Sequence, residues 1–378
     1  MNLESHTHTG TQVDTLDFIP SVKELPHNFD HHNKLLLDAS NPLLWNIKKY
    51  ETDLKNERKK QYISVRSLTF TPEGNYLIGG TISGSLYIWN ALLMLSENDD
   101  LRAEHTKPFR VIENISSSAI HYFLVAEDLL FCGTDTDLRC FSWNEILNSK
   151  NAKPEFTINV PSSSLNSINF EINQIRHFNG LLYLATGDSR VHIFSIQEKK
   201  FIKSLVGHSG YVLCLELYNN CKIVSGDSEG FIKIWNMCDL FCESTLVPTF
   251  SKEMNGIFPP ISDMCIDTSA TWLVVLSGKH IVLWHLPSQT QTFCLRSHVL
   301  LRCICWVENT IVVGGNSNIL YCYELDGRLI SMAETAIPSI YRLAHHEQLG
   351  RVLVCAGKGH RLGVFISLNY QSYELSLY

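Results

Sequence analysis

Charged residues are scarce in this sequence, and positive charge is in deficit. Asp, Glu, Lys and Arg make up only 18% of the 378 residues, and 38 acidic side chains outnumber 31 basic ones. The formal net charge of -7 provides no positive field of the kind that draws a protein onto nucleic acid. We therefore expect any association with RNA to be indirect.

Long apolar runs are also missing. The sequence has no stretch of about 18 apolar residues, the length needed to span a membrane. Its first ten residues, MNLESHTHTG, lack the basic and then apolar pattern of a secretory signal peptide. These two absences predict a soluble, intracellular protein that has no membrane partner.

Catalytic and metal-binding signatures are absent as well. We find no Gly-x-Ser-x-Gly, no phosphate-binding loop and no Cys-x-x-Cys pair. We expect the two thiols of the stretch Cys303-Ile304-Cys305 to point to opposite faces of a predicted strand and therefore not to hold one ion. The sequence thus predicts no enzyme, no metal, no cofactor and no small-molecule substrate.

Cysteine, in contrast, is well represented. Most of the twelve cysteines fall within apolar stretches, and a chain of this length does not need disulfide staples. We expect small buried thiols in a reducing compartment. Those predicted to be buried are Cys132, Cys214, Cys265, Cys303, Cys322 and Cys355.

The stretch from Val206 to Asn236 carries the strongest structural pattern. A Gly-His pair precedes three short apolar strands, and the last of them ends in Trp235-Asn236, a pattern typical of one WD40 propeller blade. We predict that His208, Ser225 and Trp235 share hydrogen bonds that hold this blade together. Glu229, six residues before the tryptophan, is expected to supply the acid of the tight turn.

The same pattern recurs along the chain. Short strands with turn residues between them continue from residue 63 to the end, and they group into seven blades. An acidic residue stands six positions before an aromatic one in three of these repeats. The three pairs are Asp137 and Trp143, Asp188 and Phe194, and Glu229 and Trp235. The predicted first strands of the seven blades are residues 64–70, 120–124, 172–178, 211–217, 261–266, 301–306 and 340–343.

We accordingly predict an all-β protein, a seven-bladed WD40-type β-propeller over residues 61–378 with an N-terminal extension over residues 1–60. The extension is expected to be partly disordered and to contain a short amphipathic helix over about residues 43–54, capped by Asn41. Residues 371–377 are expected to complete blade seven in chain order, unless residues 16–19 add to that edge.

Two groups in the extension have competing interpretations. His27, His31 and His32 could gather on one side of a helix, but a polar tail explains them better. A run of basic residues resembles a split nuclear import signal, and a solvated helix face explains the same residues. The basic residues are Lys48, Lys49, Lys55, Arg58, Lys59 and Lys60.

From about residue 61 onward, the sequence resembles the THO complex subunit 6 family of WD40 propellers. The resemblance rests on the blade patterns of residues 71–77, 207–208, 225–226, 235 and 283–286, and most of all on the C-terminal runs 364–370 and 375–378. It implies a nuclear accessory subunit, with the cytoplasm as a second compartment, that functions in mRNP packaging and nuclear mRNA export. The implied partners are the coiled-coil subunits 5 and 7 of such a complex.

A propeller fold alone does not define a function. We predict that the protein is a non-catalytic binding platform. The first alternative is a WD40 substrate adaptor or scaffold of another complex, such as a ubiquitin ligase. A propeller hydrolase is the alternative from a different class. Tyr211, at the start of the first strand of blade four, is the predicted partner-binding residue, because an exposed aromatic side chain at the rim is a suitable anchor.

Overall fold

The computed structural model describes residues 49–55, 58, 62–96, 99–149, 152–161, 171–219, 221–250 and 258–378. The chain divides into two units, residues 1–57 and 58–378. The boundary that we predicted falls after residue 60. Residues 49–55 are helical and overlap the end of the predicted amphipathic helix. The remaining predictions for residues 1–48, including those on His27, His31, His32 and residues 16–19, lie outside the described residues, as do Lys48, Lys59 and Lys60.

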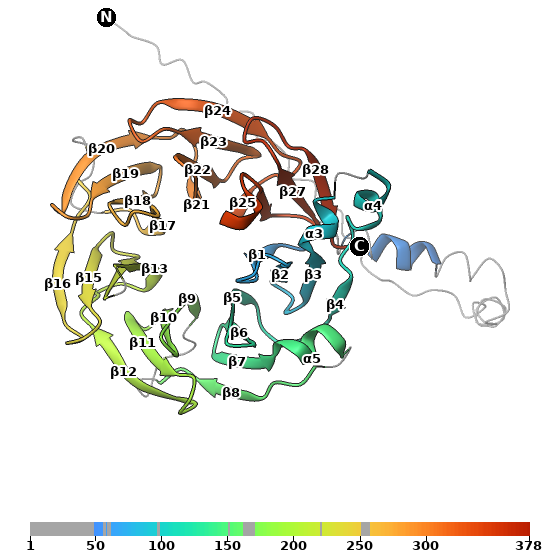
Figure 1. The fold of residues 1–378 in the computed structure, drawn as a ribbon, viewed down its shortest axis with the longest axis horizontal. Coiled ribbons are helices and arrows are strands. Elements are labelled where there is room, and N and C mark those ends of the chain that lie inside the picture. Colours follow the sequence, from blue (N-terminus) through green and yellow to red (C-terminus); the bar gives the residue numbers. More distant parts are fainter. Residues whose placement is uncertain are drawn as a thin grey trace, which may run out of the picture. The chain divides into compact units, whose positions relative to one another are not determined.

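The second unit is a ring of seven four-stranded antiparallel sheets, which we call blades 1 to 7 in chain order (Figure 1). The predicted seven-bladed propeller is confirmed. Blades 1 to 4 contain β1 (Val65–Phe70), β2 (Tyr76–Thr81), β3 (Leu86–Asn90) and β4 (Arg110–Ile112); β5 (Ile120–Ala126), β6 (Leu129–Thr134), β7 (Asp137–Ser142) and β8 (Phe156–Asn159); β9 (Ile172–Phe178), β10 (Leu181–Thr186), β11 (Arg190–Ser195) and β12 (Lys200–Val206); and β13 (Val212–Tyr218), β14 (Lys222–Asp227), β15 (Ile232–Asn236) and β16 (Cys242–Leu246).

Blades 5 to 7 repeat the same order. They contain β17 (Ile261–Ile266), β18 (Trp272–Ser277), β19 (His280–His285) and β20 (Thr290–Arg296); β21 (Leu301–Val307), β22 (Thr310–Gly315), β23 (Ile319–Tyr323) and β24 (Leu329–Glu334); and β25 (Ile340–His345), β26 (Leu353–Gly357), β27 (Arg361–Phe365) and β28 (Tyr373–Ser376). In every blade the first strand in chain order lies nearest the centre of the ring (Figure 1).

Short helices occupy the longer connections. The connection between the third and fourth strands of blade 1 forms α3 (Ala91–Met94) and α4 (Asp99–Glu104). Asn90 caps α3, because its side chain accepts a hydrogen bond from the Leu93 backbone N–H. The other helices are α5 (Trp143–Asn148) and the 3₁₀ turn η1 (Glu347–Leu349). None of the helices among the described residues combines the length and apolar character required to cross a bilayer.

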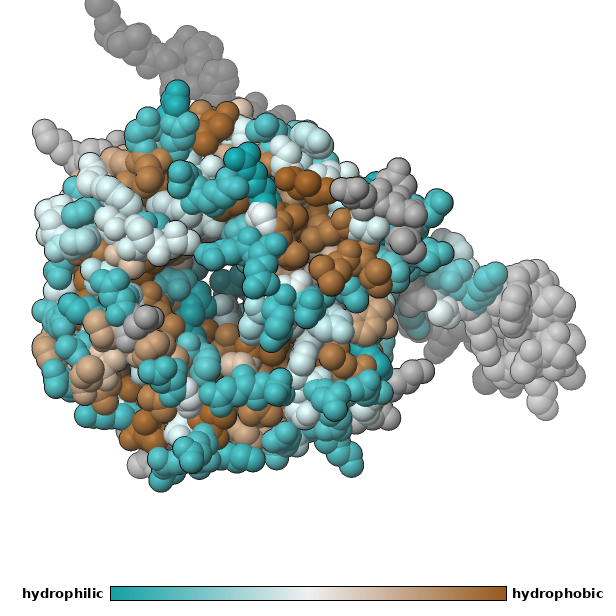
Figure 2. All heavy atoms as spheres, in the orientation of Figure 1, coloured by the Kyte–Doolittle hydropathy of each residue, from teal (hydrophilic) through white to brown (hydrophobic). Residues whose placement is uncertain are grey.

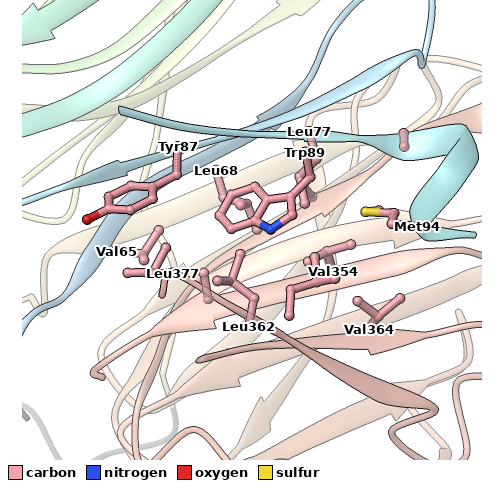
Figure 3. Packing of buried hydrophobic residues seen from close by; sticks show 14 of the residues in the cluster. Val65, Leu68, Leu77, Tyr87, Trp89, Met94, Val354, Leu362, Val364 and Leu377 are labelled. Carbon is pink, nitrogen blue, oxygen red and sulfur yellow. The ribbon is translucent and has the colours of Figure 1, made fainter. Parts of the chain in front are cut away.

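The ring closes by packing blade 7 against blade 1. As predicted, β28 completes blade 7 in chain order, so no strand from the start of the chain contributes to that sheet among the described residues. Trp89 and Leu77 of blade 1 pack with Leu362 and Leu377 of blade 7 in one buried cluster (Figure 3). Burial of apolar side chains at this seam stabilises the closed ring.

Several of the junctions between neighbouring blades also carry hydrogen bonds from the innermost strands, which we call polar latches. The third residue of the strand reaches the next blade in several cases: Ser67 Oγ accepts from the Phe123 N–H (2.9 Å), Gln174 Oε1 from the Leu215 N–H (2.8 Å) and Asp263 Oδ2 from the Ile304 N–H (3.1 Å). At the closing junction the Arg342 Nε donates to the Arg66 carbonyl oxygen (3.1 Å). These bonds fix the angle between blades in addition to apolar packing.

The cysteines occupy the positions expected of small apolar residues. All six that were predicted to be buried are buried, and the structure shows free thiols throughout. Burial raises the pKa of the Cys355 thiol to about 12, so it stays protonated and unreactive at neutral pH. The prediction that Cys303 and Cys305 point to opposite faces is wrong, because two residues apart in a regular strand they lie on the same face of β21. Cys303 is buried, and the partly exposed Cys305 packs against the same apolar cluster.

Candidate partner-binding surface and the blade 4 network

Blade 4 contains a continuous hydrogen-bonded network. Trp235 Nε1 donates to Ser225 Oγ (2.7 Å), Ser225 Oγ lies 2.6 Å from His208 Nε2, and His208 Nδ1 lies 2.7 Å from Asp227 Oδ2. Because the Asp227 carboxylate can only accept, His208 donates to it from Nδ1–H. The Ser225 hydroxyl, whose oxygen accepts from the indole, has its own proton available for His208 Nε2. Every polar side-chain atom of this network thereby has a hydrogen-bond partner inside the core.

Our assignment of Glu229 to this network is wrong, because Asp227 provides the carboxylate. Asp227 Oδ1 accepts from the backbone N–H groups of Glu229 (3.0 Å) and Phe231 (2.8 Å), while the Glu229 side chain is exposed. The acid that forms the turn is Asp227, which stands eight residues before Trp235 and not six. The link between β14 and β15, residues 228–231, is longer than the link between β10 and β11, residues 187–189.

The aromatic residue assigned to blade 2 also needs correction. The strand register pairs Leu130 with Phe141, just as Ile223 pairs with Trp235 in blade 4. Phe141 therefore takes the tryptophan place, and Trp143 begins helix α5. In blade 3 the register does place Phe194 opposite Leu182, as the sequence indicated.

The complete network occurs in blade 4 alone among the described residues. In blade 1 the strand register puts Gly79 where Ser225 stands, so Trp89 Nε1 donates instead to the Thr106 carbonyl oxygen (3.3 Å). In blade 5 Val275 takes this place, and the buried Trp284 Nε1 has no hydrogen-bond partner. Of these three blades with a tryptophan at this place, blade 4 alone joins its indole to a buried serine and histidine.

The order Ser225, His208, Asp227 is also the order of a hydrolase triad. Here, however, Ser225 and Asp227 are 0% exposed and His208 is 8% exposed. The Ser225 oxygen accepts from Trp235, and a substrate carbonyl cannot reach it. The arrangement therefore performs the structural task of holding the blade together.

Ser225→Ala is expected to destabilise the protein by about 1 to 3 kcal/mol, since it leaves Trp235 Nε1 and His208 Nε2 buried without partners. Equilibrium urea unfolding measures the loss. Ser244→Ala in β16 of the same blade is the matched control, because the buried Ser244 Oγ makes no hydrogen bond and its removal costs little. Equal losses in the two variants would show that the network contributes nothing.

Tyr211 lies immediately before β13, and 62% of its surface is exposed. Its backbone is held in place, because the Tyr211 N–H donates to Ser228 Oγ (2.9 Å) and its carbonyl oxygen accepts from the Ser228 N–H (2.9 Å). The side chain is thus presented from a fixed turn, as an anchor for a partner requires. Its role in partner binding stays a prediction.

The two ends of the central channel are lined by different residues. One cavity, of about 420 Å³, is lined by the second residue of each innermost strand, and we call this end the mouth. These seven residues are Arg66, His121, Asn173, Leu213, Ser262, Arg302 and Tyr341. Figure 2 shows one end of the channel as a hollow at the centre of the ring, with hydrophilic residues gathered around it. None of these seven residues was among the predicted site residues, because only the closed ring brings them together.

A cavity of about 550 Å³ occupies the opposite part of the channel. Within it Arg176 Nε donates to Glu216 Oε2 (3.0 Å), and Arg176 Nη1 donates to the Tyr122 hydroxyl. Burial raises the pKa of the nearby Asp263 carboxyl to about 6, and the charge of Arg342 opposes that rise. Arg176, Glu216 and Tyr122 come from three different blades and form hydrogen bonds with one another, so their polar atoms do not require a ligand.

A further cluster at the mouth was not foreseen from the sequence. His121, Asp135 and Glu171 each place a ligand atom within 4.8 Å of the others, and His121 Nε2 lies 2.6 Å from Asp135 Oδ1. Such donors can bind a divalent cation, but exposed acidic groups often gather without one. We take these residues as the acidic side of the mouth.

Comparison with known proteins agrees with the fold and with the blade 4 pattern. A family model described as "WD domain, G-beta repeat" matches residues 58–90 and 199–236, the second of which contains the network. Sheet topology, blade count and this match define the chain as a seven-bladed WD40-type propeller.

The similarity extends over most of the chain to one particular kind of propeller. "THO complex subunit 6" of Homo sapiens is 23% identical over 338 residues, which cover 86% of this chain and 96% of that protein. "THO complex subunit 6" of Arabidopsis thaliana is 24% identical and covers 82% and 90%, and that of Drosophila melanogaster is 21% identical and covers 86% and 92%. The resemblance to the THO complex subunit 6 family is thereby confirmed.

Proposed function

We propose that this chain is a non-catalytic scaffold subunit of a THO-type complex in the nucleus, where it supports mRNP packaging and nuclear mRNA export through protein contacts. The observation that carries the proposal is the similarity to proteins named THO complex subunit 6 over more than four fifths of this chain. Coiled-coil subunits 5 and 7 of the complex are its proposed partners, and its association with RNA is indirect.

The described surface is consistent with a binding platform. Seven apolar clusters and the polar latches hold the blades in fixed positions, so the loops between strands present side chains from a rigid frame. The one Ser-His-Asp arrangement described above is buried, which favours a scaffold over a hydrolase.

Affinity purification of the tagged protein from nuclear extract, with and without RNase, is expected to recover the THO subunits in both cases, since the proposed contacts are between proteins. Mass spectrometry identifies them. Stable recovery of cullin adaptors in place of THO subunits, or loss of the THO subunits after RNase, would contradict the proposal.

The same purification tests Tyr211 as an anchor. Tyr211→Ala is expected to reduce recovery of the partner, because an exposed aromatic side chain at a hot spot carries a large share of binding energy. Tyr370→Ala is the matched control, since Tyr370 is 63% exposed and lies in the last blade. Equal recovery with the two variants would remove Tyr211 from the interface.

A further inference from the structure

Positive charge is concentrated on one side of the mouth. Arg302, Tyr341 and Arg66 are the second residues of β21, β25 and β1, so they line the cavity from three consecutive blades, 6, 7 and 1. The Arg66 guanidinium carbon lies 5.2 Å from the centroid of the Tyr341 ring. Arg342 lies next to Tyr341 in β25 and also lines the cavity. We call these four residues the arginine arc.

Neither Arg66 nor Arg302 has an acidic partner among the described residues, whereas the charge of Arg342 acts on the buried Asp263 carboxyl. Several guanidinium groups elsewhere in the described chain pair with carboxylates, as in Arg139 with Asp137 (3.0 Å) and Arg361 with Glu374 (3.0 Å). Arg66 donates to no carboxylate, Arg302 Nε donates to the Asn316 side-chain oxygen (3.2 Å), and Arg342 Nε donates to a backbone oxygen. Most of their N–H donors thus remain available to a ligand at the mouth.

The opposite side of the mouth is acidic. Glu171 is exposed, and Asp135 is partly exposed beside His121. The charge of the residues around the cavity is therefore positive on blades 6, 7 and 1 and negative on blades 2 and 3. A long polyanion lying across the ring would meet these carboxylates, which disfavours RNA as the occupant, as does the net charge of -7.

The chemistry of the arc fits a carboxylate-bearing peptide. A planar guanidinium matches a carboxylate with two parallel N–H donors, and the aromatic face of Tyr341 keeps the Arg66 group in position. A cavity of about 420 Å³ accommodates one or two side chains of a peptide that lies over the mouth.

We propose that the arginine arc at the mouth of the channel is a binding site for a short acidic peptide segment of a partner protein, whose Asp or Glu carboxylates pair with Arg66 and Arg302. Arg342 adds positive charge from deeper in the channel. The acidic side of the mouth sets the direction of the segment by repelling its carboxylates toward the arc. The site depends on the chemistry of the ring alone and not on membership of a THO-type complex.

The test uses the full chain and a fluorescent peptide of about ten residues in which Glu alternates with Gly, compared with the same peptide carrying Gln. Fluorescence anisotropy at low salt measures binding. We expect the Glu peptide to bind, the Gln peptide not to bind, and the double variant Arg66→Gln, Arg302→Gln to weaken the Glu peptide about tenfold. Raising the salt concentration is expected to weaken binding as well.

The matched control is the double variant Arg328→Gln, Arg351→Gln. It removes the same charge from two exposed arginines that are paired with Glu324 and Glu308 away from the mouth. Binding of the Glu peptide is expected to stay at the wild-type level. Equal weakening of Glu-peptide binding in the two double variants would show that the weakening comes from the change in net charge, and it would overturn the proposal.

Two further outcomes would also overturn it. One is the absence of binding by the wild-type chain at peptide concentrations up to about 1 mM, the weakest affinity of interest. The other is binding of a single-stranded oligouridylate that depends on Arg66 and Arg302 while the Glu peptide does not bind. Circular dichroism of each variant confirms that the ring is folded, so that loss of binding reports on the arc.

Discussion

Trp235→Ala is expected to lower the free energy of unfolding by about 3 to 5 kcal/mol, the range for removing a large buried aromatic side chain. The indole is 1% exposed and packs between blades 3 and 4 with Tyr183, Val191 and Leu215. Its loss also removes the proton donor of Ser225 Oγ. Equilibrium urea unfolding measures the effect.

Trp143→Ala is the matched control for that substitution. Trp143 is partly buried at the start of α5 and meets Tyr76 edge to face, with 5.8 Å between ring centroids. Because it lies outside the core of blade 2, a smaller loss is expected than for Trp235→Ala. Equal losses, or an unchanged unfolding midpoint for Trp235→Ala, would contradict the central place given to Trp235.

Asp263→Asn is expected to remove a pH dependence of stability of about 3 kcal/mol. Burial raises the pKa of Asp263 to about 6, some two units above its ordinary value, and each unit corresponds to about 1.4 kcal/mol. Between about pH 4 and pH 6 the folded chain holds the proton and the unfolded chain does not. The stability that this proton contributes is therefore present at pH 4 and is lost as the pH rises through 6.

The measurement is urea unfolding of the wild type and the variant at about pH 4.5 and about pH 7.5. We expect the wild type to gain stability relative to Asp263→Asn at the lower pH. Gln174→Ala is the matched control, because Gln174 latches blade 3 to blade 4 as Asp263 latches blade 5 to blade 6, but without a titrating group. Its cost is expected to be the same at both pH values. A constant difference for Asp263→Asn would refute the raised pKa.

The propeller could be predicted from sequence because strand alternation and turn residues are local signals that repeat seven times. The order of strands, the closure by β28 and the pairing of His208, Ser225 and Trp235 all follow from one blade pattern applied along the chain. The acid of the network could not be read the same way. Turn length differs between blades, so counting back from the aromatic pointed to Glu229 where the structure has Asp227.

The mouth lay beyond sequence reasoning for a different reason. Its residues come from seven separate repeats of the chain, and only closure of the ring brings Arg302, Tyr341 and Arg66 together. The register of the innermost strands determines which side chain faces the channel, and a register shift between Val65 and Ser67 is not visible in the sequence. Trp143 shows the same limit, because strand pairing alone distinguishes it from Phe141.

Attachment of the last strand to the first blade has a consequence for biosynthesis. The Tyr373 hydroxyl donates to the Met94 carbonyl oxygen (2.6 Å), and the Ser376 N–H donates to the Thr106 carbonyl oxygen (3.0 Å). While the chain is being translated, the apolar face of blade 1 that packs against blade 7 therefore stays uncovered until nearly all the other blades have been made. Newly made chains expose that face for the whole of elongation, which makes blade 1 the natural place for a chaperone to act before the ring shuts.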